Sequence, residues 1–265
     1  MTARPDRPSL AEPGGTTPST TTPARSRLVR AELAKARAAR STLVLVALAP
    51  PFCALWAALL ARLPAPDDAA RVAGVYAMAQ QAYVFAMLLG VMGTAGEYRH
   101  RTITWAFLAT PGRGAVVAAK LAAYGLIGLL VAVPSAAATL LAGASLLSAG
   151  GHPALTGDVP LVLLGATAST VLYALLGVAL GALIRSQVAA VALTVLLFAY
   201  GDYTLGLFLP DVYRWLPTGA ARALGGLRPD SGPLLPWWGG GLLFGAYVAA
   251  FVLLARLVTL RRDVT

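Results

Sequence analysis

Residues 121–147 read LAAYGLIGLLVAVPSAAATLLAGASLL, without one charged side chain. An apolar stretch of about 20 residues is long enough to cross the ~30 Å hydrocarbon core of a bilayer as a helix. Five further stretches of this kind occur in the chain. The sequence therefore predicts an all-α, polytopic membrane protein with six transmembrane helices, at residues 42–60, 72–93, 121–147, 159–184, 188–209 and 237–257.

The composition of the whole chain agrees with this expectation. Of its 265 residues, 58% are hydrophobic and 12% are charged, whereas soluble domains are about 45–50% apolar and about 25% charged. So few charged side chains cannot cover a water-soluble surface, which disfavours a soluble enzyme. The single cysteine, Cys53, excludes an internal disulfide and a cysteine-based metal cluster.

The positions of the basic residues predict the orientation in the membrane. If both termini are cytoplasmic, the inner segments carry 16 of the 21 lysines and arginines against five acidic residues, and the outer loops carry five cations against six acids. Cationic loops are retained on the cytoplasmic side. The net charge of +10 is then a topology signal that requires no nucleic-acid partner. We expect a multi-pass protein of the cell membrane.

The segment before the first span divides into two parts. Residues 1–24 are rich in Pro, Thr, Ser and Gly, which predicts a disordered cytoplasmic tail ahead of a transmembrane domain at 25–265. Residues 25–40 contain Ala, Arg and Leu without Gly or Pro, which predicts a lead-in helix. Its cations can lie against anionic membrane lipids. An ordinary solvated helix fits this segment almost as well.

Few polar or small residues within the spans call for an explanation. Gln80 and Gln81 in the second span are either interhelical hydrogen-bonding groups or part of a substrate path. Asp202, near the outer end of the fifth span, is interpreted as an interfacial carboxylate that water reaches. Two pairs of glycines at four-residue spacing permit close helix packing, within the chain or at a dimer seam: Gly177 with Gly181 and Gly241 with Gly245.

The cytoplasmic loop after the second span, GTAGEYRHRTITWAFLATPGRGAVVAAK at residues 93–120, contains a helix signature. Thr94 followed by Glu97 resembles a capping box and predicts a helix that starts near Ala95, and Pro111-Gly112 ends it. At about 100° per residue, side chains gather on two nearly opposed faces, Tyr98, Thr102 and Trp105 on one and His100, Ile103 and Phe107 on the other. Such a helix needs two partners, and we expect these to be the protein's own membrane ends and a separate subunit. Coverage of both faces by the chain's own loops is the alternative.

The same loop resembles that of the ABC-2 type permeases, the membrane subunits of ATP-binding cassette exporters. Their loop commonly reads E-Y-R-x-G-T, then L, P-x-R and a Lys that opens the next span. The matching residues here are Glu97, Tyr98, Arg99, Thr102, Leu108, Pro111, Arg113 and Lys120. Arg101 departs from the pattern, because Gly is usual there. The order of lead-in helix, six spans and short outer helices at 210–236 matches the family as well.

The resemblance implies a function and a set of partners. The loop helix would be a coupling helix that docks into a cytoplasmic ABC ATPase subunit, through Glu97, Tyr98, Arg99, His100, Thr102, Trp105 and Phe107. A second permease chain, identical or paralogous, would complete the export path. The cargo would be a hydrophobic or amphipathic compound such as a drug, a peptide antibiotic or a lipid.

The chain lacks motifs for its own energy supply. A phosphate-binding loop requires Gly-Lys-Ser/Thr, yet Lys35 and Lys120, the two lysines of the chain, each follow Ala. We therefore expect no enzymatic activity and no cofactor in this chain, with ATP and Mg²⁺ bound by the partner ATPase. Two alternatives remain. An ion-gradient-driven secondary transporter calls for charges near mid-membrane, and an integral-membrane lipid enzyme calls for clustered Asp, His or Ser.

Overall fold

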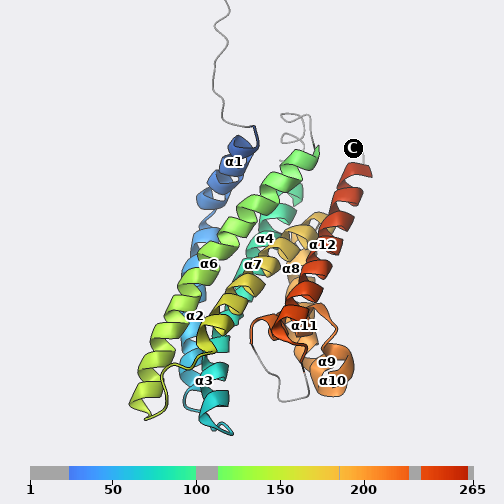
Figure 1. The fold of residues 1–265 in the computed structure, drawn as a ribbon. Helices are drawn as coiled ribbons and strands as arrows, with labels where there is room; N and C mark the ends of the chain where they lie inside the picture. The colour runs from blue at the N-terminus through green and yellow to red at the C-terminus, as the bar shows by residue number, and fades with distance from the viewer. Residues whose placement is uncertain (1–23, 100–112, 185, 227–233, 262–265) are drawn as a thin grey trace, which may run out of the picture.

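The computed structural model describes residues 24–99, 113–184, 186–226 and 234–261, and every element in these ranges is helical (Figure 1). Five helices are long and apolar enough to cross a membrane, as befits a polytopic membrane protein. They span Arg40–Leu60, Asp68–Glu97, Gly114–Ala149, Val159–Leu183 and Trp237–Val258. These five coincide with five of the six predicted spans.

The helices follow one another with short breaks. The chain begins with α1 (Ala24–Ala38) and continues, after extended backbone at Ala39, into α2 (Arg40–Leu60). The second spanning helix is composite, with a 3-10 turn η1 between two α-helical parts. The remaining long helices are α6, α7 and α12. The composite helix consists of α3 (Asp68–Ala77), η1 (Met78–Ala82) and α4 (Tyr83–Arg99). The other three are α6 (Arg113–Ala149), α7 (Val159–Leu183) and α12 (Trp237–Arg261).

The prediction of a sixth span at 188–209 is not confirmed. This stretch forms three short helical pieces, α8 (Gln187–Val195), the π-helical η2 (Leu196–Gly201) and α9 (Asp202–Phe208). The hydrogen-bonding pattern changes at η2, and a π-helical turn interrupts the regular α-helical repeat. The break before α8 lies at the polar residues Ser186 and Gln187, and the Ser186 hydroxyl accepts a hydrogen bond from the Ala189 amide at 3.3 Å.

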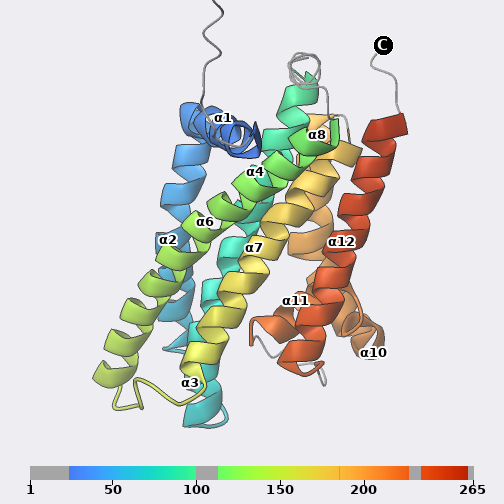
Figure 2. The same ribbon diagram turned by 45° about the horizontal axis from the view of Figure 1, so that its top comes forward.

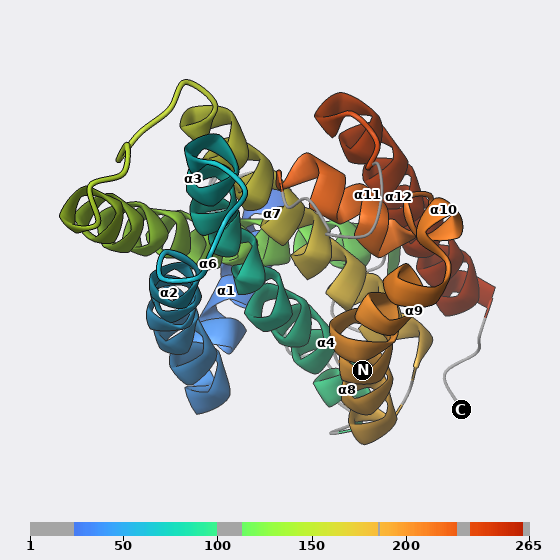
Figure 3. The same ribbon diagram turned by 90° about the horizontal axis from the view of Figure 1, so that it is seen from below.

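Two short helices follow, within the segment 210–236 for which the sequence predicts short helices. They are α10 (Pro210–Tyr213) and α11 (Pro217–Leu224). Seen from below in Figure 3, α11 lies beside α7 and α12, with which it packs. Its backbone comes so close to α12 that a β-carbon at Gly240 would lie 2.6 Å from the Ala220 carbonyl oxygen.

The centre of the bundle is the seam between α4 and α7. In the helix Asp68–Glu97, 67% of the most apolar 18-residue stretch is buried. The corresponding share is 17% in the peripheral helices α2 and α12. A β-carbon at Gly177 would overlap the Met87 carbonyl oxygen, and one at Gly181 would lie 2.7 Å from the Val91 carbonyl oxygen. The first glycine pair therefore serves packing within the chain. A β-carbon at Gly245, in the second pair, would meet nothing within 4 Å.

The bundle has two chemically different ends. Figures 1 and 2 show α1, the end of α4, the start of α6 and the end of α12 at one end, which we call the basic end. The exposed charged side chains that the structure describes there are cations: Arg27, Arg30, Lys35 and Arg37 on α1, Arg40 at the start of α2, and Arg256 on α12. The opposite end mixes both signs, with Arg62, Arg71, Arg214 and Arg222 beside Asp67, Asp68, Asp158 and Asp211. That the basic end faces the cytoplasm stays a prediction.

Candidate functional site

Four charged side chains from three helices form a closed ring at the basic end. Helix α1 supplies Glu32 and Lys35, one turn apart, α4 supplies Glu97, and α6 supplies Lys120. Lys35 Nζ lies 2.6 Å from Glu32 Oε1 and 3.0 Å from Glu97 Oε1. Lys120 Nζ lies 2.5 Å from Glu32 Oε2 and 3.0 Å from Glu97 Oε1. Each lysine thus contacts both glutamates, and we call these four residues the ion ring.

Two of the four side chains of the ion ring are buried, and a third is partly buried. The exposed fractions are 6% for Lys120, 7% for Glu32 and 12% for Glu97, whereas Lys35 is 51% exposed. Buried ions are tolerated only when they are paired and hydrogen-bonded, because desolvation of each costs several kcal/mol. Two cations and two anions balance here. The ring therefore has a buried core and one solvated corner.

The ion ring shifts the pKa values of Glu32 and Lys35, its two residues on α1. Burial alone would raise the pKa of Glu32, but the charges and hydrogen bonds of Lys120 and Lys35 outweigh it and hold the pKa below its usual value. Burial would lower the pKa of Lys35, but hydrogen bonds and charge attraction from Glu32 and Glu97 raise the pKa above its usual value. Both groups are therefore ionised at neutral pH.

The predicted start of a helix near Ala95 is wrong. Helix α4 runs without a break from Tyr83 to Arg99, so Thr94 and Glu97 lie inside a helix rather than at its start. Thr94 is buried, with 3% of its surface exposed. The S/T-x-x-E spacing also occurs wherever a helix simply continues, and here burial against α7 carries the helix past Ala95. Glu97 faces Lys35 and Lys120 of its own chain.

Most of the predicted docking residues lie outside the described residues. The backbone of Tyr98 and Arg99 completes α4, whereas His100, Thr102, Trp105 and Phe107 belong to the segment 100–112. The coupling helix therefore stays a prediction. The structure does describe the motif residues on either side of this segment. Lys120 Nζ lies 3.0 Å from Glu97 Oε1.

Sequence reasoning missed the ion ring, although one signal was present. Glu32 and Lys35 stand at helical i, i+3 spacing, and Lys35 and Lys120 are all the lysines of a chain otherwise supplied with arginine. That two such rare side chains share the same glutamates could not be read from the sequence, because Glu32 and Lys120 are 88 positions apart.

Gln80, in η1, is a buried polar residue within the helix bundle. Its side chain is 2% exposed, and its Nε2 donates to Ser169 Oγ at 2.8 Å and to the Ala221 carbonyl oxygen at 2.6 Å. It thus links η1 with α7 and α11. This contact matches the interhelical hydrogen bonding of the two interpretations. Gln81 is half-buried, and a substrate path there stays a prediction.

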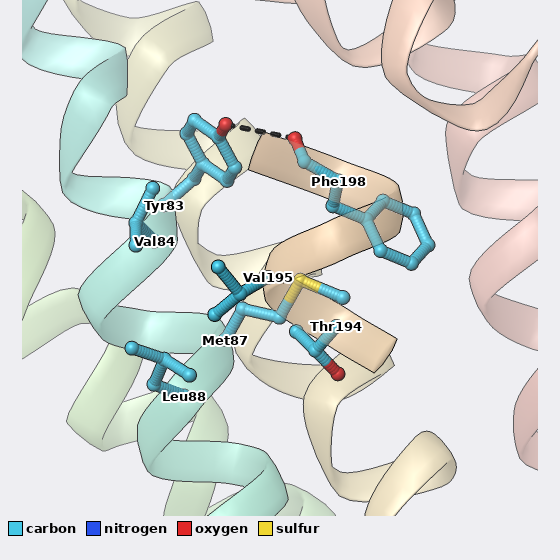
Figure 4. Close-up of a pocket in the computed structure, with 7 residues that line it drawn as sticks. All are labelled: Tyr83, Val84, Met87, Leu88, Thr194, Val195 and Phe198. Carbon is cyan, nitrogen blue, oxygen red and sulfur yellow. Dashed lines mark hydrogen bonds between the residues drawn. The ribbon is translucent and has the colours of Figure 1, made fainter. Parts of the chain in front are cut away.

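A small apolar pocket lies between α4 and the α8–η2 segment (Figure 4). The Tyr83 hydroxyl donates to the Phe198 carbonyl oxygen at 3.0 Å and bridges the two elements. Tyr83 also stacks on Tyr173 of α7, with ring centroids 4.5 Å apart. The residues around the pocket are Tyr83, Val84, Met87, Leu88, Thr194, Val195 and Phe198.

No part of the described chain gathers three or more His, Cys, Asp or Glu side chains in a way that could hold a metal ion. Comparison with protein-family models found no match for this chain. Comparison with curated protein sequences found no matching protein.

Proposed function

We propose that this chain is the membrane-spanning permease subunit of an ABC exporter of the ABC-2 type. In this proposal it moves a hydrophobic or amphipathic substrate, such as a drug, a peptide antibiotic or a lipid. A separate cytoplasmic ATPase binds ATP and Mg²⁺ and supplies the energy, and a second permease chain, identical or paralogous, completes the export path. The chain lies in the cell membrane with both termini in the cytoplasm.

The ion ring is the observation that carries this proposal. Glu97 and Lys120 are two of the residues on which the resemblance rests, and they flank the segment expected to dock the ATPase. Lys120 Nζ lies 3.0 Å from Glu97 Oε1, and each of the two residues also pairs with α1, Lys120 with Glu32 and Glu97 with Lys35. The ion pair between Glu97 and Lys120 therefore joins the two ends of the motif in space. This supports reading the stretch from Glu97 to Lys120 as one functional element.

The position of the buried charges favours this reading over the ion-gradient alternative. A gradient-driven transporter binds its coupling ion near the bilayer midplane. The ion ring instead lies at the basic end, two residues from the end of α4. Gln80, the buried polar group deeper in the bundle, is neutral and hydrogen-bonded to two other elements. These contacts support a subunit that receives its energy from a partner.

The test is docking of the ATPase through the aromatic residues of the loop. Trp105→Ala and Phe107→Ala should each weaken binding of a co-expressed ABC ATPase by about 30- to 1,000-fold, because loss of a buried aromatic anchor costs about 2–4 kcal/mol. Co-purification from detergent-solubilised membranes measures the loss. Membrane abundance should not change, since the spans determine insertion.

Trp237→Ala is the matched control, because Trp237 is 52% exposed and begins α12 at the opposite end. It should retain the ATPase fully. Full retention of the ATPase by both loop variants would show that the loop is not the docking element.

A further inference from the structure

Helix α1 is attached to the bundle mainly by charge. Among its described side chains, Glu32 and Ala36 are buried, whereas its larger apolar residues are only half-buried. The apolar contact of α1 with the core consists of Ala36 and the half-buried Leu33, and so small an apolar surface holds the helix weakly. The strong contacts of α1 are the ion pairs of Glu32 and Lys35 with α4 and α6.

The connection from α1 to α2 does not fix the direction of α1. Ala39 between them has φ −83° and ψ 117°, which is extended backbone and interrupts the helical hydrogen-bond ladder. Figure 2 shows α1 turned away from the axis of α2. The orientation of α1 therefore depends on its contacts with the bundle, which are the packing of Ala36 and Leu33 and the ion pairs of the ion ring.

Lys120 has a special position in the ion ring. It is the buried cation, it contacts both glutamates, and its Nζ lies 3.4 Å from the Gly93 carbonyl oxygen. Without it, Glu32 of α1 and Glu97 of α4 would face one another with only the half-exposed Lys35 between them. Like charges at such short range repel. The contact between α1 and α4 would then change from attraction to repulsion.

We propose that the ion ring is an electrostatic clamp that holds α1, the end of α4 and the start of α6 as one rigid body, with Lys120 as its positioning residue. If the proposed function is correct, on which this consequence rests, a displacement of α4 or α6 by a docked ATPase is passed to α1. The clamp itself requires no partner, because every member belongs to this chain.

Distance measurement between two spin labels tests the clamp directly. In a Cys53→Ala background, cysteines at Ala34 on α1 and Ala118 on α6, both exposed, carry the labels in the chain reconstituted alone in lipid nanodiscs. The parent protein should give one narrow distance. Lys120→Met should give a broad distribution shifted to longer distances, because α1 is repelled. An unchanged narrow distance in Lys120→Met would overturn the proposal.

A charge-balanced rescue separates the clamp from general packing. Glu32→Gln combined with Lys120→Met leaves one carboxylate, Glu97, with one ammonium, Lys35, and should restore the narrow distance. If Lys120→Met does not accumulate in membranes, the double variant should restore accumulation to the parent level. A double variant as defective as Lys120→Met would overturn the proposal, because only packing would then explain the defect.

Two controls complete the design. Lys35→Met removes the solvated corner of the ring and should leave the distance narrow. Asp68→Asn removes the carboxylate that lies 2.8 Å from His152 Nδ1 at the opposite end, and should also leave it narrow. A broad distance in Asp68→Asn would show that the loss of any polar contact loosens α1, and would overturn the proposal. Because no ATPase is present, these results are independent of whether the loop docks one.

Discussion

The α4–α7 seam and the attachment of α1 are both close helix contacts, but opposite chemistry makes them. At the seam, glycines such as Gly177 let one backbone touch the other, and the sequence of α7 contains no charged residue. At α1, the ion ring joins side chains across three helices, and the apolar contact is small. Close packing depends on shape and therefore resists pH and salt. An ionic contact depends on charge balance and can be changed by solution conditions.

The largest loss of folding stability is expected from a substitution at the α4–α7 seam. Gly177→Ala places a methyl group where it overlaps the Met87 carbonyl oxygen, and overpacking of this kind costs about 1–3 kcal/mol. Thermal unfolding of the detergent-purified protein measures the loss.

Gly245→Ala is the matched control, because its new methyl group would meet nothing within 4 Å. We expect a change within about 0.5 kcal/mol for that variant. Equal stability of the two variants would show that the seam is not tightly packed.

The next largest loss of stability is expected from the neutral hydrogen bonds of Gln80. Gln80→Leu removes the donor to Ser169 Oγ and to the Ala221 carbonyl oxygen and leaves both groups buried, which costs about 1–2 kcal/mol. The same unfolding assay applies. Gln81→Leu, at the half-buried neighbour, should change stability little. A larger loss in Gln81→Leu than in Gln80→Leu would contradict the hydrogen-bonding role of Gln80.

The smallest effect is expected from pH at the ion ring. The pKa of Glu32 is lowered in the folded protein, so its contribution is present above the carboxyl pKa of the unfolded chain and is lost as pH falls through the folded value. Acidification should therefore reduce the difference in Tm between the parent and Glu32→Gln, by about 2–4 °C at most. A difference that stays constant, or grows, on acidification would show that Glu32 is not ionised in the fold.

The spans could be predicted because bilayer thickness imposes a length that apolar composition reveals. Residues 121–147 lie within the longer α6, whose first turns are more polar. The division of 188–209 could not be predicted, because hydropathy does not distinguish an α-helical from a π-helical hydrogen-bond pattern at Leu196. Likewise, Thr94 and Glu97 have the same spacing at a helix start and within a helix.

The candidate site was accessible to sequence reasoning only in part. The loop motif pointed to Glu97 and Lys120 because their order along the chain is characteristic. Their ion pairs with Lys35 and Glu32 arise from the way α1 packs on the bundle, and that geometry has no counterpart in local sequence. Gln80 could be recognised as an unusual polar residue in a span, but its acceptors on α7 and α11 could not be identified before the fold was known.

The rarity of lysine has a practical consequence for chemical labelling. An acylating reagent that modifies primary amines finds two lysine side chains in the whole sequence, besides the terminal amine. Lys35 is 51% exposed and Lys120 is 6% exposed. The first should acylate readily, and the second should be protected as long as α1 stays in place. The ratio of the two modified peptides in a mass spectrum then reports the state of the ion ring in native membranes, without any introduced probe.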